Sequence, residues 1–405
     1  MPKPRLLIVL NRLSIGGPAT NTLAVAHALK DEFDILLLAG EPVKGEESAA
    51  FLLERYSGFQ VQKITSMKRA VLPLNDYHAY KQIKKIIKSF QPHIIHTHGS
   101  KPGVIARLAA SKCNVPVIAH TYHGHVFHSY FSSVISSCIV SLERWLAKKS
   151  SLIIAINERL KNDLTSIYKI ALPQKIKLNR LGIDVDAMQD QEGDKRKQFR
   201  TEFQLQPNEV AIGIVGRLVP VKQHHLFAKL AIDLLHANIA QPIRFFIIGD
   251  GDERQNLEQQ FNDHQISFTF SGHTFKDNAP IVFTSWRKDM DVVMAGLDIV
   301  TLTSQNEGTP ISVMEAMAAG KPVVAPDVGG IAELFQNNKN GRMFQQPVQL
   351  YNLVLELVQS EGQRSNLGSN ARKFALQELT LQKQVQSLFE IYLTFLSGST
   401  PPSAV

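Results

Sequence analysis

The sequence predicts an α/β protein of two domains, each built around a parallel sheet. Short apolar runs that suit buried strands alternate with longer amphipathic segments that suit helices, and glycine or proline separates them. The chain has 405 residues, which is enough for two domains with substantial cores. In open sheets of this kind ligands bind at the carboxyl ends of the strands, so functional residues are expected in the loops there.

The N-terminal half begins with a strand at residues 6–10, a glycine-rich loop and a helix at 21–30. Gly16 and Gly17 in that loop lack G-x-G-x-x-G spacing, so they are weak evidence for a dinucleotide site, and a tight turn explains them equally well. Residues 75–90 predict an amphipathic, lysine-rich helix. The other elements expected in this half are strands at 33–40, 93–98 and 152–156, a strand and loop at 115–125, and helices at 99–110, 126–150 and 157–168.

Histidines gather at two of these strand ends. The six are His93, His96, His98, His120, His123 and His125. Metal ligation is one explanation, but zinc sites usually carry a clearer pattern of cysteine, histidine and glutamate. We therefore predict no metal site here.

Charge is distributed unevenly along the chain. Residues 1–180 carry 25 lysines and arginines against 11 acidic residues, whereas residues 181–405 carry 19 against 25. Such a basic half favours an anionic acceptor, an anionic membrane surface or nucleic acid, and an ordinary solvated surface is the alternative. Because no nucleic-acid-binding motif accompanies the charge, we predict no nucleic-acid partner.

The remaining composition points to the cytoplasm. Cys113 and Cys138 have no metal or redox spacing, which is consistent with a reducing compartment. Residues 6–10 are too short for a signal-peptide core, and no apolar stretch reaches the roughly 20 residues that span a bilayer. We expect a cytoplasmic protein whose membrane contact is at most peripheral.

The stretch from residue 307 to residue 320 is the most informative in the C-terminal half. Glu307 and Glu315 stand eight positions apart, Thr309 suits a helix N-cap and Pro310 suits the first helical position. The free N–H groups of that helix suit a phosphate, and Gly308 lets a ligand approach the backbone. Carboxylates on both sides of an anion site match a nucleotide sugar, although ordinary surface glutamates would have the same spacing. The flanking strands are expected at 298–304 and 322–326, with Gly320 ending the helix.

A second candidate site element follows a predicted strand at 210–216. Gly216 and Arg217 end this strand, and Lys222 follows five positions later. Two cations beside a helix start suit a diphosphate. Asp289 and Asp291 have the spacing of a metal-binding pair, but their polar surroundings predict a helix start.

Residues 304–334, SQNEGTPISVMEAMAAGKPVVAPDVGGIAEL, closely resemble the donor site of retaining glycosyltransferases of the GT-B fold, family 4. Residues 181–184 resemble that family's link between domains. The resemblance implies two Rossmann-like domains with parallel sheets that face each other across a cleft. They would be an acceptor-binding domain at 1–181 and a nucleotide-sugar-binding domain at 182–380, with a helix at 381–397 crossing back to the first.

The same resemblance implies roles for individual residues. His123 would face the donor sugar, with His120 and His125 as neighbours whose alignment could slip. Glu307 would bind sugar hydroxyls and Glu315 the ribose, while Arg217 and Lys222 would stabilise the leaving diphosphate in place of a metal ion. The catalytic candidates are therefore His123, Glu307, Arg217 and Lys222. The donor-binding candidates are Gly16, Gly17, Gly216, Arg217, Lys222, His273, Thr274, Glu307, Gly308, Thr309, Pro310, Ile311 and Glu315.

The implied activity is a retaining transfer of a hexosyl or N-acetylhexosaminyl group from a nucleotide-diphosphate sugar, with a UDP-sugar favoured. The expected acceptor is a saccharide, lipid-linked as on a polyprenyl diphosphate, in the synthesis of cell-surface polysaccharide or glycoconjugate. No metal or other cofactor is expected. Two alternatives stay open, a non-hydrolysing sugar-nucleotide epimerase of related fold and a non-catalytic regulator that binds a nucleotide sugar.

An anionic membrane surface is the partner that the basic half predicts, at the cytoplasmic face of the inner membrane. The lysines of the helix at 75–90 could meet lipid headgroups. Phe127, Tyr130 and Phe131 could meet a lipid acceptor, and packing in the core is the alternative for these aromatic side chains.

Overall fold

The computed structural model describes residues 2–43, 45–68, 70–124, 133–237, 239–271, 279–336 and 339–398. The chain forms two compact units. The N-terminal unit contains the residues up to Gly182 together with the last helix, α15 (Leu381–Leu396), and the C-terminal unit contains Ile183–Thr380. Among the described residues, no helix combines the length and the apolar character needed to cross a membrane.

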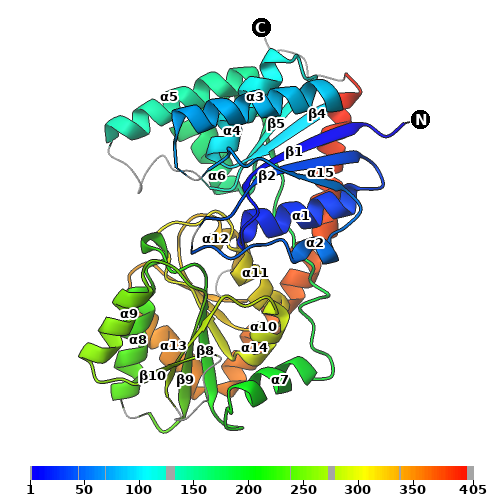
Figure 1. Ribbon diagram of the computed structural model, residues 1–405. Helices are drawn as coiled ribbons and strands as arrows, with labels where there is room; N and C mark the ends of the chain where they lie inside the picture. The colour runs from blue at the N-terminus through cyan, green and yellow to red at the C-terminus, as the bar shows by residue number, and fades with distance from the viewer. Residues whose placement is uncertain are drawn as a thin grey trace. The chain divides into compact units, whose positions relative to one another are not determined.

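A seven-stranded parallel sheet with the order β3-β2-β1-β4-β5-β6-β7 forms the centre of the N-terminal unit (Figure 1). Its strands are β1 (Arg5–Arg12), β2 (Asp34–Gly40), β3 (Gln60–Lys63), β4 (Ile94–His98), β5 (Val117–Tyr122), β6 (Leu152–Ala155) and β7 (Ile176–Leu178). Its other helices are α1 (Gly17–Leu29), α2 (Leu52–Arg55), α3 (Pro73–Phe90), α4 (Ser100–Lys112), α5 (Ser133–Lys149) and α6 (Glu158–Asn162), with a π-helical turn at Asp163–Ile167 and a 3-10 turn at Pro173–Lys175.

Alternation along the strands builds two cores, one on each face of this sheet. In β1, Leu6 and Ile8 pack on the face that α1 and α15 cover, and Leu7 and Val9 pack on the face of α3 and α4. Successive strand residues point to opposite faces, so both faces of a parallel sheet can be buried under helices. The apolar run that predicted β1 therefore serves two cores at once.

The C-terminal unit repeats this architecture with the strand order β10-β11-β9-β8-β12-β13-β14, again parallel. The strands are β8 (Val210–Val215), β9 (Ile243–Ile248), β10 (Phe268–Phe270), β11 (Ile281–Ser285), β12 (Ile299–Thr301), β13 (Val323–Pro326) and β14 (Arg342–Phe344). The helices are α7 (Asp194–Glu202), α8 (His224–His236), α9 (Arg254–Asp263), α10 (Met290–Gly296), α11 (Ile311–Ala318), α12 (Ile331–Leu334), α13 (Val348–Gln359) and α14 (Glu361–Glu378), with a 3-10 turn at Pro220–Lys222.

Three of the boundaries that differ from the sequence prediction border predicted site residues. Helix α1 begins at Gly17 and not at residue 21, because Pro18 suits the first helical turn. Helix α11 begins one residue later than predicted, and Pro310 is its N-cap in place of Thr309. The Pro310 carbonyl accepts hydrogen bonds from the N–H groups of Val313 and Met314, so Pro310 itself precedes the helix. Strand β12 is shorter than the predicted 298–304.

Both sheets reverse their strand order at one point. The reversal falls between β1 and β4 in the N-terminal unit and between β8 and β12 in the C-terminal unit. Neighbouring loops diverge at such a switch point and leave room for a ligand at the carboxyl ends of the strands. The loops after β8 and β12 carry the residues from 216 to 222 and from 302 to 310, so most of the predicted donor site lies at the switch point of the C-terminal unit.

Candidate functional site

The ends of β8 and β12 bring two predicted site residues into direct contact. These strands are hydrogen-bonded neighbours, with Ile212 opposite Ile299. Beyond them, Lys222 Nζ donates to Glu307 Oε1 at 2.6 Å. Sequence analysis assigned both side chains to one ligand, and the fold places them in an ion pair.

Backbone and side-chain hydrogen bonds tie the two loops together. The Thr303 hydroxyl donates to the carbonyl oxygens of Lys222 at 2.9 Å and of Gln223 at 3.0 Å. The Gln305 N–H donates to the Val221 carbonyl at 2.8 Å. Because these bonds fix the backbone on both sides, the positions from which Lys222 and Glu307 extend are held independently of their own ion pair.

Two glycines allow neighbouring loops to pack closely against this site. A Cβ atom at Gly329 would lie 1.8 Å from the Glu307 carbonyl oxygen, and one at Gly249 would lie 2.1 Å from the Gly216 carbonyl oxygen. No side chain fits such gaps. The Gly330 N–H also donates to the Gly308 carbonyl at 2.6 Å, so Gly329 and Gly330 support the loop that carries Glu307.

Glu315 lies in α11, the helix that follows the loop of Glu307. Burial, and second the negative charge of Asp291, raise the pKa of Glu315 from its ordinary 4.5 to about 7. Asp291 itself pairs with Lys195 at 2.9 Å. Within the described part of the chain, the Glu315 carboxylate makes no hydrogen bond, so it is a candidate to receive one from a ligand hydroxyl.

The structure places the other donor-site candidates in two groups. Gly216 and Arg217 directly follow β8, and Gly308, Thr309 and Pro310 lie between Glu307 and the start of α11 at Ile311. His273 and Thr274 lie outside the described residues. Asp289 is the N-cap of α10 and Asp291 lies in its first turn, which confirms the helix start predicted there.

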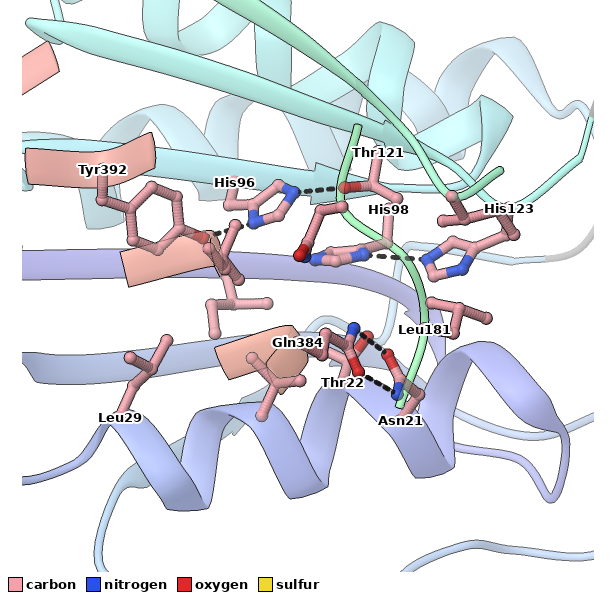
Figure 2. Close-up of a pocket in the computed structure, with 15 residues that line it drawn as sticks. Asn21, Thr22, Leu29, His96, His98, Thr121, His123, Leu181, Gln384 and Tyr392 are labelled. Atoms are coloured by element: carbon pink, nitrogen blue, oxygen red, sulfur yellow. Dashed lines mark hydrogen bonds between the residues drawn. The ribbon is translucent and has the colours of Figure 1, made fainter. Parts of the chain in front are cut away.

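The glycine loop of the N-terminal unit leads directly into α1, with Gly16 as N-cap and Gly17 as the first helical residue. One turn further, the amides of Asn21 and Gln384 exchange two hydrogen bonds of 2.8 and 2.9 Å (Figure 2). Both side chains also bond the backbone of Gly182. Helices α1 and α15 are thereby joined to the last residue of the N-terminal unit, a contact for which the sequence offered no signal.

A chain of hydrogen bonds runs from α15 into the sheet (Figure 2). Tyr392 Oη lies 2.5 Å from His96 Nδ1, and His96 Nε2 lies 2.7 Å from Thr121 Oγ1. A second histidine, His98, packs against His96 with the two rings tilted and their centres 4.1 Å apart, and its Nδ1 lies 2.9 Å from His123 Nε2. These side chains line a cavity of about 20 Å³, which is enough for about one water molecule.

The environment keeps these imidazoles neutral. Burial lowers the pKa of His123 from 6.5 to about 4, and burial together with the charge of His123 lowers that of His96 to about 3. Burial and the neighbouring histidines lower the pKa of His98 well below its ordinary value. A neutral imidazole has one N–H donor and one acceptor nitrogen, so His123 can share a hydrogen bond with His98 and still offer its second nitrogen to a ligand.

His120 belongs to a different network on the opposite face of the sheet. Its Nδ1 lies 2.8 Å from Thr97 Oγ1, and its ring is 1 % exposed. There Glu143 Oε2 accepts from Arg107 at 2.6 Å and from Tyr122 at 2.5 Å. Burial and the Arg107 cation lower the pKa of His120.

The six histidines are therefore not one cluster. His93 lies before β4, where its Nδ1 accepts from the Arg5 N–H at 3.0 Å. His125, like the three aromatic residues at 127, 130 and 131, lies outside the described residues. Of the histidines that could face a ligand, His123 is at the strand end and His120 is enclosed by the core. In the described ranges no three histidine, cysteine, aspartate or glutamate side chains are arranged to hold a metal ion, and metal independence stays a prediction.

Comparison with known proteins assigns the chain to a family. Residues 195–374 match the model for glycosyl transferases group 1, and residues 15–187 match the model for glycosyltransferase family 4. The chain belongs to the group 1 glycosyltransferases of the GT-B type, which confirms the resemblance in its sequence and the two Rossmann-like domains.

Curated relatives are similar over most of their length. The chain is 24 % identical over 334 residues to UDP-Gal:alpha-D-GlcNAc-diphosphoundecaprenol alpha-1,3-galactosyltransferase of Escherichia coli, covering 82 % of each chain. It is 22 % identical over 332 residues to the putative glycosyltransferase EpsD of Bacillus subtilis, covering 80 % of this chain and 83 % of that one.

Solved structures share the fold. Anabaena HepE in complex with UDP and glucose superimposes with a TM-score of 0.78 at 20 % identity, over 96 % of this chain and 100 % of that one. WaaG, a glycosyltransferase involved in lipopolysaccharide biosynthesis, superimposes with a TM-score of 0.73 at 14 % identity, over 95 % and 99 %.

Proposed function

We propose that this glycosyltransferase transfers a hexosyl or N-acetylhexosaminyl group from a UDP-sugar to a lipid-linked saccharide, with retention of the anomeric configuration and without a metal ion. The observation that carries the proposal is the arrangement at the switch point of the C-terminal unit. A cation, Lys222, and a carboxylate, Glu307, share a site that is followed by a helix N-terminus and by a second carboxylate, Glu315. This order fits a nucleotide-diphosphate sugar, which has a sugar at one end, a ribose toward the other and the diphosphate between them.

The chemistry follows from the charges. Negative charge develops on the diphosphate as its bond to the sugar breaks, and fixed cations and N–H groups stabilise it without reorganisation. Lys222, Arg217 and the N–H groups of α11 are our candidates for this task. Glu307 would hold sugar hydroxyls, Glu315 would hold the ribose, and His123 would bond the sugar through the nitrogen that His98 does not engage.

Support for a UDP-sugar and a lipid-linked acceptor comes from similar proteins. The Escherichia coli relative is named for UDP-Gal and for an acceptor on diphosphoundecaprenol, and HepE is described with UDP and glucose. We extend both features to this chain, in the synthesis of a cell-surface polysaccharide or glycoconjugate. Such an acceptor lies in a membrane, so the N-terminal unit should present a surface to lipid.

Helices α3 and α5 carry features that fit an anionic membrane surface. Both pack beside α4 on one face of the sheet (Figure 1). The exposed apolar residues at the start of α3 and along α5 are Val71, Leu72, Leu74, Tyr77, Val134, Ile135, Leu142 and Trp145. Lys81 Nζ lies 4.6 Å from the Tyr77 ring centre, and Lys149 Nζ lies 4.6 Å from that of Trp145.

Aromatic rings beside lysines are typical of membrane interfaces, where the rings enter the headgroup layer and the cations meet anionic lipid. Each basic residue near such a surface contributes about 1 kcal/mol, which salt screens. We therefore propose peripheral binding at the cytoplasmic face of the inner membrane.

The donor test uses the purified full-length chain. A thermal-shift screen of nucleotide sugars should show stabilisation by UDP-sugars, because a ligand that binds the native state raises its stability by mass action. Radiolabelled UDP-galactose, UDP-glucose and UDP-N-acetylglucosamine are then incubated with and without GlcNAc-diphosphoundecaprenol. Transfer that requires the acceptor supports the proposal. Conversion of the donor alone would indicate an epimerase, and binding without any conversion would indicate a regulator.

The membrane test is co-sedimentation with phosphatidylglycerol and phosphatidylcholine vesicles. Binding should require the anionic lipid and decrease at high salt. Replacing Lys81, Lys84, Lys85 and Lys88 by glutamate should abolish it, and Leu74→Ser should weaken it without changing the salt dependence. The control Lys197→Glu/Lys373→Glu reverses two exposed charges of the C-terminal unit and should bind like the wild type. Equal binding to neutral vesicles, or loss in the control, would refute the proposed surface.

A further inference from the structure

Glu307 Oε1 accepts two hydrogen bonds, and the second comes from a residue outside the predicted site. Lys222 Nζ donates at 2.6 Å and Ser304 Oγ donates at 2.5 Å. Ser304 is 1 % exposed, and the Glu307 side chain is 9 % exposed. Oε2 of Glu307 has no partner within the described part of the chain. One carboxylate oxygen is thus held by the protein, and the other remains for a ligand.

The two donors differ in what a diphosphate does to them. Lys222 is the cation that a diphosphate needs, so an arriving phosphate competes with Glu307 for the same ammonium group. The Ser304 hydroxyl is neutral and buried, so the negative charge of the ligand does not attract it away from Glu307. The ion pair that orients Glu307 before binding is therefore the contact that binding weakens.

We propose that Ser304 is a positioning residue, which keeps Glu307 Oε1 in place when the diphosphate draws Lys222 away, so that Oε2 can accept from a sugar hydroxyl. The proposal rests on the proposed donor site and adds a residue and a sequence of events to it. Ser304 would contribute little to binding of the nucleoside diphosphate itself. It would matter once the ligand carries a sugar.

The ion pair between Lys222 and Glu307 leads to a second prediction, which would not follow if Glu307 only stabilised the loop. In the free protein Glu307 neutralises Lys222, and this pairing opposes the binding of a diphosphate. Glu307→Gln removes the competing charge while it keeps the shape of the side chain. It should therefore tighten binding of UDP and weaken binding of UDP-galactose, two effects of opposite sign in one variant.

Isothermal titration of the full-length chain with UDP and with UDP-galactose tests both parts. Ser304→Ala should weaken UDP-galactose about tenfold, the size expected for one hydrogen bond to a charged group, and should change UDP affinity less than about twofold. Glu307→Gln should tighten UDP about threefold or more, because the cation no longer has a carboxylate partner. In a Glu307→Ala background, which lacks the oxygen that accepts from Ser304, Ser304→Ala should have no further effect on UDP-galactose.

The matched control is Thr301→Val. The Thr301 hydroxyl is equally buried and donates to the Gly213 carbonyl at 3.2 Å, in the same segment but without contact to Glu307. This variant should bind both ligands like the wild type.

The outcomes separate the inference from the proposed function. If Ser304→Ala weakens UDP and UDP-galactose equally, or if its effect persists in the Glu307→Ala background, Ser304 supports the loop in general and the inference is overturned. If Glu307→Gln leaves UDP affinity unchanged, the exchange of Lys222 is overturned. If the wild-type chain binds neither UDP nor UDP-galactose, the proposed function is refuted, and the inference that rests on it is refuted as well.

Discussion

Acidification from pH 7 to pH 5 should destabilise the N-terminal unit and leave the C-terminal unit nearly unchanged. Burial holds the pKa of His96 at about 3 and that of His123 at about 4, against 6.5 for an exposed histidine. A depressed histidine pKa means that the unfolded chain binds the proton and the folded unit does not. Stability from this source is full above pH 6.5 and is lost as the pH falls below it.

The magnitude follows from proton linkage. For each histidine that stays neutral in the folded unit, the unfolding free energy of the unit decreases by about 1.4 kcal/mol per pH unit below 6.5. Between pH 7 and pH 5, His96 and His123 together account for about 4 kcal/mol. His98 and His120 have lowered pKa values as well and act in the same direction. A loss of this size is a large fraction of the stability of an ordinary domain.

In the C-terminal unit two groups oppose each other. The pKa of His224 is lowered to about 3, so acid weakens the unit by about 2 kcal/mol over the same range. The pKa of Glu315 is raised to about 7, so its stability is full below pH 4.5 and is lost as the pH rises through 7. Acidification from pH 7 to pH 5 therefore increases the unfolding free energy by about 2 kcal/mol through Glu315, which offsets the loss through His224.

The chain contains two tryptophans, one in each unit, which makes the test direct. Trp286→Phe leaves Trp145 in α5 to report on the N-terminal unit, and Trp145→Phe leaves Trp286 to report on the other. Urea unfolding is followed by fluorescence at pH 5, 6 and 7. His96→Gln should reduce the acid loss reported by Trp145 by about 2 kcal/mol, the share of one buried histidine. An unfolding free energy from Trp145 that is equal at pH 5 and pH 7 would refute the reasoning.

Three further predictions concern buried charge and the donor site. Glu143→Gln should lower the unfolding free energy of the N-terminal unit by about 3 kcal/mol or more, measured by the same fluorescence, because it leaves the buried Arg107 cation uncompensated. Glu315→Gln should weaken UDP about tenfold in calorimetry, and wild-type affinity should decrease below pH 7 as Glu315 gains a proton, a dependence that the variant should lack. Transferase activity should persist in EDTA, whereas Arg217→Ala and Lys222→Ala should each lower turnover by about 100-fold; activity that returned only with Mn²⁺ or Mg²⁺ would contradict this.

Local pattern sufficed to predict the strands and the helix that carry the proposed donor site. The stretch from β12 through α11 to β13 is contiguous, so strand, loop, helix and stop signals could be read in order. Gly320 ends α11 with φ +71, a conformation that glycine adopts without strain, as expected for a helix C-terminus. The N-cap was misplaced by one residue, because proline is acceptable on either side of a helix start, and β12 is shorter than predicted.

Elements without apolar periodicity were missed. Helix α7 is strongly charged, and tertiary packing rather than amphipathicity holds it, with Phe199 against Phe203 and Phe246 at ring-centre distances of 4.7 and 5.0 Å. Strand β3 lies at the sheet edge with mostly exposed residues, so it lacks the buried run that marks the central strands. Propensity has little influence where a single aromatic contact or an edge pairing decides the structure.

Contacts between distant segments set the limit of prediction for the site. His96 and His98 lie on one predicted strand and His120 on the next, and from the sequence they could be grouped only by their position at the two strand ends. The register of β4 and β5 pairs Thr97 with His120, so His120 shares the face of Thr97, and the pleat sends His96 and His98 to the other face. The register between β4 and β5 decides which histidine side chains can contact each other. This register cannot be read from a single sequence.

The same limit explains why Ser304 was not identified. Lys222 and Glu307 are 85 residues apart, and each was assigned separately to the donor. Their mutual ion pair follows from the adjacency of β8 and β12, which local pattern cannot show. In the exchange that we propose, a carboxylate that gives up its cation to the substrate needs a second donor, and Ser304 is the hydroxyl that the fold places on the same oxygen. The role that we propose for Ser304 thus depends less on its being a serine than on the displacement of its neighbour Lys222 by the diphosphate.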